Sequence, residues 1–134
     1  MARLVKSIYS GLSVTSLGET TDTDTLDGPL AATVTTLTDA ATITVNMATS
    51  CNFTVTLGGN RTLGNPTGTV NGQTGSIFIA QDGTGSRTLA YSSNWEFPNG
   101  AAPTLTTTAN AVDRLDYIVK SSTSIQAVLT TNYS

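Results

Sequence analysis

The sequence predicts an all-β fold, an antiparallel β-sandwich or jelly-roll-like single domain with an extended N-terminal arm. Three observations predict it. The 134 residues include 27 Thr, 13 Ser and 12 Gly but only 11% charged residues, and Thr favours strands whereas Ser and Gly favour turns. Apolar residues recur at every second position in several short segments, as in half-buried strands. The length suits one hydrophobic core.

The first thirty residues differ in pattern from the rest. Residues 1–18 carry widely spaced apolar residues, and residues 19–29 contain one Glu and three Asp. We therefore expect an extended arm and an acidic hinge over residues 1–30, followed by the β-sandwich domain over residues 31–134. The acidic spacing departs from that of a calcium-binding EF-hand loop, so a solvated hinge is favoured over a metal site.

The first clear strand covers residues 41–47, where four apolar residues alternate with polar ones. Residues 31–38 are its expected partner strand. The alternation returns over residues 53–57 and stops at the sequence Gly58-Gly59-Asn60. Such a sequence tolerates positive φ angles and favours tight turns, so we expect a tight reversal there.

The middle of the chain reads as loop, central strand and hairpin. Residues 64–75 are rich in Gly, Asn and Pro, whereas residues 76–80 are apolar on both faces, as a central strand would be. The sequence Asp82-Gly83-Thr84-Gly85 indicates a turn, after which residues 87–91 are expected to pair back. Residues 95–100 follow as an aromatic-rich loop or corner.

The last third gives the strongest local prediction. Apolar residues alternate with others over residues 115–120 and again over residues 125–129, and Ser121-Ser122-Thr123 separates the two segments. This pattern predicts a β-hairpin. In total the chain shows about seven to nine short strands with short spacing, which is typical of sandwiches and jelly rolls. No segment predicts a helix.

Several functional classes are disfavoured by composition. The chain has no His, the usual general base and zinc ligand, and Cys51 stands alone. We therefore expect no enzyme, no cofactor and no metal. Six basic residues, a net charge of −3 and the lack of a basic stripe argue against nucleic acid. Without a membrane-length apolar run or a secretion signal, synthesis and assembly in a bacterial cytoplasm are expected.

Three aromatic residues and one charged cluster are candidate contact residues. Tyr91, Trp95 and Phe97 lie close together in the sequence. Such residues either fill a core or subunit interface, which we favour, or form a receptor loop that touches a glycan. Asp113, Arg114 and Asp116 place opposite charges on one strand, where they would set the register between subunits rather than add much stability.

Four segments together resemble a module of tailed-bacteriophage virion proteins, which include tail fibres and capsid-associated proteins. They are NFTVTLGGNRTL (52–63), GSIFI (75–79), QDGTGSRTLAY (81–91) and AVDRLDY (111–117). The resemblance covers roughly 80 residues and does not include residues 1–51. It implies a non-catalytic structural protein of the virion that forms a homotrimer, although the position of the module on the particle does not follow from the fold.

The short N-terminal arm favours a position on the capsid over a position on the tail. A tail fibre needs a long shaft, so the resemblance is read as a capsid decoration (cement) protein on the outer capsid surface that joins adjacent major capsid subunits. The alternative is a tail-fibre or receptor-binding tip that contacts a host surface glycan or protein. In the decoration reading the capsid-binding arm consists of six residues: Arg3, Leu4, Val5, Lys6, Ile8 and Leu12.

Overall fold

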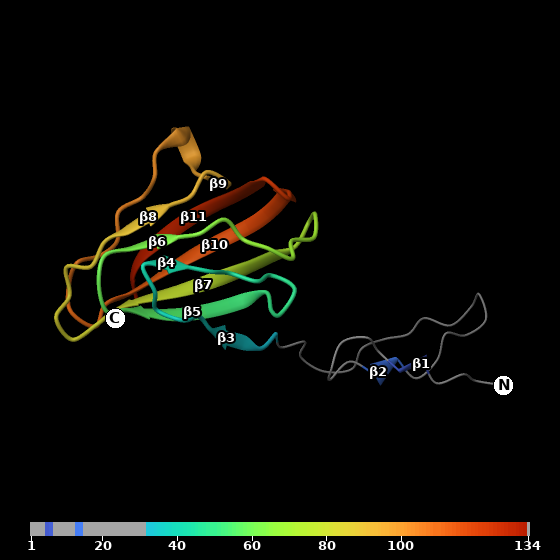
Figure 1. Cartoon of the computed structure of the whole chain (residues 1–134), viewed down its shortest axis with the longest axis horizontal. Coiled ribbons are helices and arrows are strands. Elements are labelled where there is room, and N and C mark those ends of the chain that lie inside the picture. Colours follow the sequence, from blue (N-terminus) through green and yellow to red (C-terminus); the bar gives the residue numbers. More distant parts are fainter. Residues whose placement is uncertain (1–4, 7–12, 15–31, 134) are drawn as a thin grey trace. The chain divides into compact units, whose positions relative to one another are not determined.

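The computed structural model describes residues 5–6, 13–14 and 32–133 (Figure 1). The chain divides into two compact units, residues 1–31 and 32–134. In the first unit, strands β1 (Val5–Lys6) and β2 (Ser13–Val14) pair antiparallel. The rest of the expected arm, including four of its six named residues, and the acidic hinge lie outside the described residues.

The second unit consists of strands and one short 3-10 turn, η1 (Pro98–Gly100). The strands in chain order are β3 (Val34–Thr36), β4 (Thr42–Ile43), β5 (Asn52–Leu57), β6 (Arg61–Leu63), β7 (Thr74–Gln81), β8 (Leu89–Tyr91), β9 (Trp95–Glu96), β10 (Val112–Ser121) and β11 (Ser124–Tyr133). They form a six-stranded sheet in the order β3-β5-β7-β10-β11-β9 and a three-stranded sheet in the order β4-β6-β8. The prediction of an all-β single domain is confirmed.

Strand pairing is mixed, which corrects the expectation of an antiparallel sandwich. Strands β3, β5 and β7 lie side by side and parallel, and so do β4, β6 and β8. From β3 to β8 consecutive strands alternate between the two sheets, so strands two apart in the sequence become parallel neighbours there. In the second unit the described antiparallel pairs are those that β10 makes with β7 and β11, and the second of these is the predicted C-terminal hairpin.

The same alternation corrects three local predictions. The turn Gly58-Gly59-Asn60 leads from β5 in one sheet to β6 in the other, so it forms a corner instead of a hairpin reversal. Strand β3, within residues 31–38, pairs with β5 and not with residues 41–47. Strand β8 pairs with β6, so the hairpin expected at residues 87–91 is absent from the described pairing.

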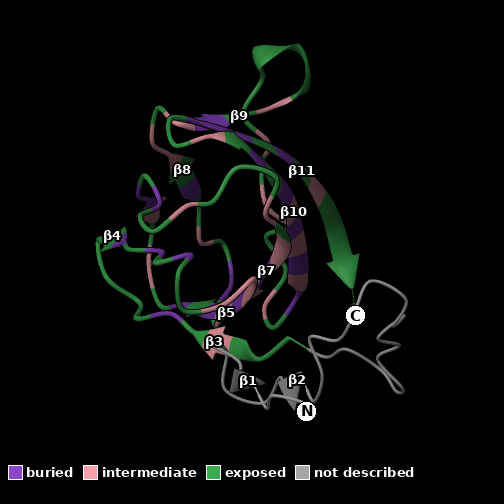
Figure 2. Ribbon diagram, turned by 90° about the vertical axis from the view of Figure 1, so that its right-hand side faces the viewer, coloured by how far each residue is buried: buried purple, intermediate pink, exposed green. Residues whose placement is uncertain are grey.

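One hydrophobic core lies between the two sheets. The largest fully buried side chains come from both of them: Phe53, Ile43, Leu57, Leu63, Ile77, Ile79, Leu115, Ile125, Val45, Val55 and Val119. Burying each such side chain stabilises the fold by about 1.5–3 kcal/mol relative to exposure. Figure 2 shows buried positions alternating with mostly half-buried ones along β5, β7 and β10, as the period-2 pattern of the sequence predicts.

The other side of the six-stranded sheet, which we name the outer sheet face, does not contribute to this core. It carries the alternate residues of each strand, for example Thr54 between buried Phe53 and Val55. Four of the five exposed large apolar residues among the described residues belong to strands of this sheet: Val34, Ile118, Val128 and Tyr133. The exposed apolar side chains are therefore concentrated on the outer sheet face, which is typical of a contact surface.

Candidate functional site

Trp95 is a core residue that connects the two sheets. Its side chain is buried, and its indole Nε1 donates a hydrogen bond of 2.9 Å to the carbonyl oxygen of Gly64. Its ring also meets that of Tyr117 edge to face at 6.2 Å between centroids. Because both the ring and its donor are satisfied inside the domain, Trp95 is not available as an exposed receptor contact.

Tyr91 and Phe97 form a second aromatic pair at the end of β8. Their ring centroids are 4.6 Å apart in an edge-to-face arrangement. The Tyr91 hydroxyl is buried without a hydrogen-bond partner among the described residues, and its burial, together with the nearby carboxylate of Asp113, raises the pKa of Tyr91. Of the three aromatic residues singled out in the sequence, Phe97 alone lines a surface groove.

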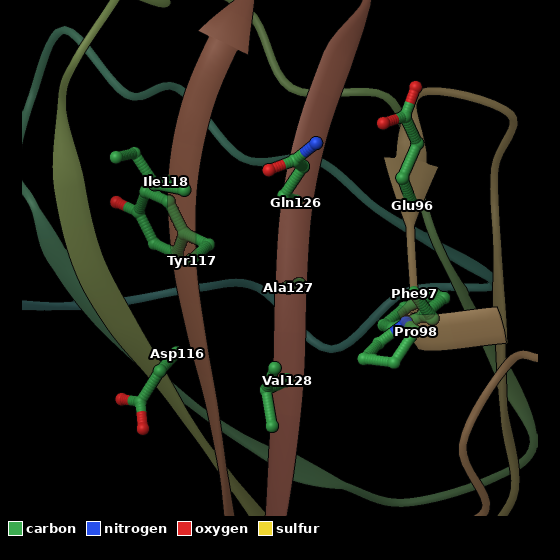
Figure 3. A pocket seen from close by; sticks show the side chains of 9 residues that line it. All are labelled: Glu96, Phe97, Pro98, Asp116, Tyr117, Ile118, Gln126, Ala127 and Val128. Atoms are coloured by element: carbon green, nitrogen blue, oxygen red, sulfur yellow. The ribbon is translucent and has the colours of Figure 1, made fainter. Parts of the chain in front are cut away.

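This groove lies where β9 and η1 adjoin the β10–β11 hairpin, and it has a volume of about 540 Å³. Figure 3 shows its nine lining residues, which are Glu96, Phe97, Pro98, Asp116, Tyr117, Ile118, Gln126, Ala127 and Val128. The parallel pairing of β9 with β11 places Glu96 beside Gln126. The pairing of β10 with β11 places Asp116 beside Val128 and Ile118 beside Gln126. Part of the outer sheet face thus forms the groove.

The groove combines hydrogen-bonding groups with exposed apolar side chains. Ile118 and Val128 are 45% and 54% exposed. The Asp116 carboxylate accepts a hydrogen bond of 2.6 Å from the Ser76 hydroxyl and forms an ion pair of 2.9 Å with Arg114. Arg114 in turn lies over the ring of Tyr133 at 5.1 Å. The opposite charges predicted from the sequence therefore pair within one chain.

Asp113 has a different environment from its charged neighbours. It is buried, and its two carboxylate oxygens accept hydrogen bonds from the backbone amides of Thr106 and Asn132, at 2.7 and 2.8 Å. Asp113 therefore links the 101–110 loop and the end of β11 to β10 by hydrogen bonds. This contact is internal to the domain, and the suggested role of Asp113 in subunit register stays a prediction.

The motif QDGTGSRTL (81–89) builds a loop of defined shape. The buried amide of Gln81 donates hydrogen bonds to the carbonyl oxygens of Arg87 and Thr106 and accepts one from the Arg87 amide. Asp82 accepts hydrogen bonds from the amides of Thr84 and Gly85, which forms the predicted turn, and pairs with Arg87 at 2.7 Å. The motif is thus structural.

The motif LGGNRT (57–62) is structural as well. The Arg61 guanidinium contacts both oxygens of Asp39, each at 2.7 Å, and the Asp39 carboxylate also accepts a hydrogen bond from the Gly58 amide. These contacts lower the pKa of Asp39. The Asn60 side chain accepts a hydrogen bond from the Thr88 amide. The segments that carry the family resemblance therefore hold together the corners of the fold.

The described residues contain no group of three or more His, Cys, Asp or Glu side chains that could hold a metal ion. Within the same part of the chain, no helix is long and apolar enough to cross a membrane. Cys51 is a free, partly buried thiol whose sulfur lies 3.7 Å from the Gln73 amide nitrogen. The acidic hinge, at which Ca²⁺ was weighed, lies outside the described residues.

The described residues form an all-β module whose outer sheet face carries exposed apolar side chains, and no catalytic constellation is recognisable among them. Residues 31–121 match the family described as "putative phage tail fibre C-terminal domain". The match covers more than half of the chain, and the protein belongs to this family. It is therefore a phage virion structural protein of the tail-fibre type. No curated protein and no solved structure matches the chain.

The sequence interpretation missed two of the three polar groups of the groove. Glu96 and Gln126 attract no attention in the sequence, because each is a single polar residue at an exposed strand position. Only the parallel pairing of β9 with β11 brings them together. The sequence analysis noted Asp116 for its charge. It did not predict that Asp116 lies in the same groove as Phe97.

Proposed function

We propose that this domain binds a glycan on the bacterial surface through the groove between β9–η1 and the β10–β11 hairpin. This is the tail-fibre alternative of the sequence interpretation, and membership of a tail-fibre family supports it. The observation that carries the proposal is the composition of the groove: two carboxylates and an amide lie beside exposed aliphatic side chains on the neighbouring strands β9, β10 and β11.

The groups of the groove suit a neutral sugar. Carboxylates such as those of Glu96 and Asp116 accept hydrogen bonds from hydroxyl groups, and the Gln126 amide both donates and accepts. Ile118 and Val128 offer apolar area to the C–H face of a sugar ring. The Glu96 carboxylate, which has no ion-pair partner among the described residues, disfavours anionic polysaccharides because like charges repel.

Adsorption of the purified, fluorescently labelled protein to cells of the strain that the phage infects tests the proposal. The double variant Glu96→Ala/Gln126→Ala removes two hydrogen-bonding groups, each contributing about 0.5–1.5 kcal/mol, and is expected to weaken adsorption about tenfold. Val70→Ala is the control, because Val70 is 65% exposed and does not line the groove. Unchanged adsorption of the double variant would contradict the proposal.

A second candidate is the capsid decoration protein, a homotrimer that joins adjacent major capsid subunits. The concentration of exposed apolar residues on the outer sheet face favours it, because such a face suits a protein partner as well as a glycan. In that case deletion of residues 1–18, which include the proposed capsid-binding arm, should abolish decoration of bare heads. Cryo-electron microscopy of intact particles separates the candidates: density on the tail supports the first, and density at capsid three-fold positions supports the second.

Enzymatic activity is not part of either proposal. The family is of a structural kind, and one of the two groove carboxylates, that of Asp116, is already bound by the Ser76 hydroxyl and the Arg114 guanidinium. Incubation of isolated host glycans with the purified protein tests this expectation. Hydrolysis would be detected by the release of reducing ends. If the native protein hydrolysed the glycan and the Glu96→Ala variant did not, the groove would be a catalytic site.

A further inference from the structure

The groove lies at one end of a row of side chains that crosses the outer sheet face. The strand registers pair the members of this row in turn, from Val128 to Asp116, Ser76, Asn52 and Val34. We name this set the cross-strand row. It passes over β11, β10, β7, β5 and β3, which are neighbours in that order. Since adjacent strands lie about 4.8 Å apart, the row is about 19 Å long. Val128 and Asp116 also line the groove (Figure 3).

Hydrogen bonds join the polar members of the cross-strand row across β10, β7 and β5. The Ser76 hydroxyl donates to the Asp116 carboxylate at 2.6 Å, and the Ser76 backbone amide donates to the Asn52 side-chain oxygen at 3.2 Å. The three side chains are half-buried, so these bonds order them while part of each stays at the surface. The Asn52 side-chain nitrogen donates to no described residue, which leaves it available to a ligand. Groups that are already ordered lose little entropy on binding.

The part of the row beyond the groove repeats the chemistry of the groove. Ser76 and Asn52 provide a hydroxyl and an amide, and Val34 adds an aliphatic side chain that is 48% exposed. Exposed Thr74 pairs with Ile118 of the groove, so a further hydroxyl lies next to the row. Hydrogen-bonding groups beside apolar area suit sugar rings. Because these added residues carry no charge, they suit a neutral sugar chain.

We propose that the ligand of the groove is a linear, uncharged polysaccharide that continues from the groove along the cross-strand row, over β7 and β5 to β3. This inference rests on the proposed glycan-binding function and extends its site. Ser76 and Asn52 form hydrogen bonds with hydroxyl groups of sugars beyond the groove, and Val34 packs against the C–H face of the most distant ring. A single terminal sugar would fill the groove alone, whereas a row of about 19 Å spans several consecutive sugars.

The dependence of affinity on chain length tests the proposal. Fragments of the surface polysaccharide from the strain that the phage infects are separated by size and titrated into the native protein by calorimetry. A disaccharide fills the groove, and a tetrasaccharide also reaches Asn52 and Val34. Each further contact strengthens binding by about two- to tenfold. We therefore expect the tetrasaccharide to bind about tenfold more tightly than the disaccharide.

A double variant removes the far end of the row and leaves the groove intact. Asn52→Asp keeps an oxygen that accepts the Ser76 amide but loses the NH₂ donor, and Val34→Ser removes the exposed aliphatic group. The double variant should bind disaccharide like the native protein, and tetrasaccharide no more than about twofold more tightly than disaccharide. Thr56→Ala is the control, because Thr56 lies exposed on the same strand as Asn52, about 13 Å away. It should keep the native length dependence.

Nuclear magnetic resonance of the native protein gives a readout that needs no variant. The side-chain NH₂ signal of Asn52 should shift when tetrasaccharide is added and should stay unchanged with disaccharide. Equal affinity for all fragment lengths, or an Asn52 signal that tetrasaccharide does not shift, would overturn the extended site while the groove proposal stands. A native protein that binds no fragment at all would overturn both.

Discussion

Gly75 is the residue whose side chain is most strictly limited by its neighbours. A Cβ atom there would lie 1.7 Å from the Cys51 carbonyl oxygen and 2.6 Å from the Tyr117 hydroxyl, which themselves share a hydrogen bond of 2.7 Å. Relief requires backbone movement between β5 and β7. We expect Gly75→Ala to lower the free energy of unfolding by about 3 kcal/mol, measured by urea denaturation.

Gly83 supplies the matched control for this substitution. Nothing lies within 4 Å of a Cβ atom built at Gly83, so Gly83→Ala should change the free energy of unfolding by less than about 0.5 kcal/mol. If both alanine variants had the same stability, the close approach at Gly75 would not be a constraint on the fold.

The ion pair between Asp82 and Arg87 makes stability depend on pH. The Arg87 guanidinium lowers the pKa of Asp82 from 3.8 to about 2. Because the folded-state pKa is depressed, the stabilisation is present above pH 4 and is lost as the pH falls from about 4 toward 2. The stability difference between the native protein and Asp82→Asn should therefore shrink over that range, as followed by thermal unfolding. A difference that stays constant with pH would contradict this assignment.

At the scale of the elements, Asp113 connects β10 to both the 101–110 loop and the end of β11. Its two oxygens accept one amide each, from Thr106 and Asn132. Asp113→Asn replaces one acceptor with a donor that faces an N–H group, so we expect a loss of about 2–3 kcal/mol. Hydrogen exchange should become faster at Thr106 and Asn132, whereas Asp116→Asn, at a partly exposed residue that contacts neither amide, should leave both unchanged.

The positions of the elements were predictable from the sequence, and their pairing was not. Period-2 alternation located β5, β10 and β11, because one face of each strand is buried and the other is not. Alternation carries no information on the direction of a neighbouring strand. Direction is set by whether the next strand joins the same sheet, as β11 does after β10, or the opposite one, as β6 does after β5.

The candidate site was predictable only in part, for a related reason. The aromatic segment pointed to the right region, and Phe97 does line the groove. Trp95 was better described by the core interpretation than by the receptor interpretation, because its indole donor is satisfied by Gly64. Glu96 and Gln126 meet through parallel pairing of strands about thirty residues apart, a contact that local patterns do not reveal.

At the scale of the whole molecule, the glycan proposal depends on how many grooves one assembly presents. In the homotrimer that the family resemblance implies, each copy would carry a groove, and linked sites bind a surface of repeated glycans with an avidity about 10²–10⁴ times greater than that of one site. We therefore expect the native protein to bind whole host cells at least about 100-fold more tightly than it binds the free glycan.

Calorimetry with free host glycan distinguishes lost avidity from a damaged groove. Free glycan binds each groove singly, so its affinity reports on a single binding site. The Glu96→Ala/Gln126→Ala variant should lose affinity for the free glycan while keeping the mass of the native protein in solution, because both residues lie at exposed positions of the groove. If this variant bound the free glycan as tightly as the native protein does, the glycan site would lie outside the groove.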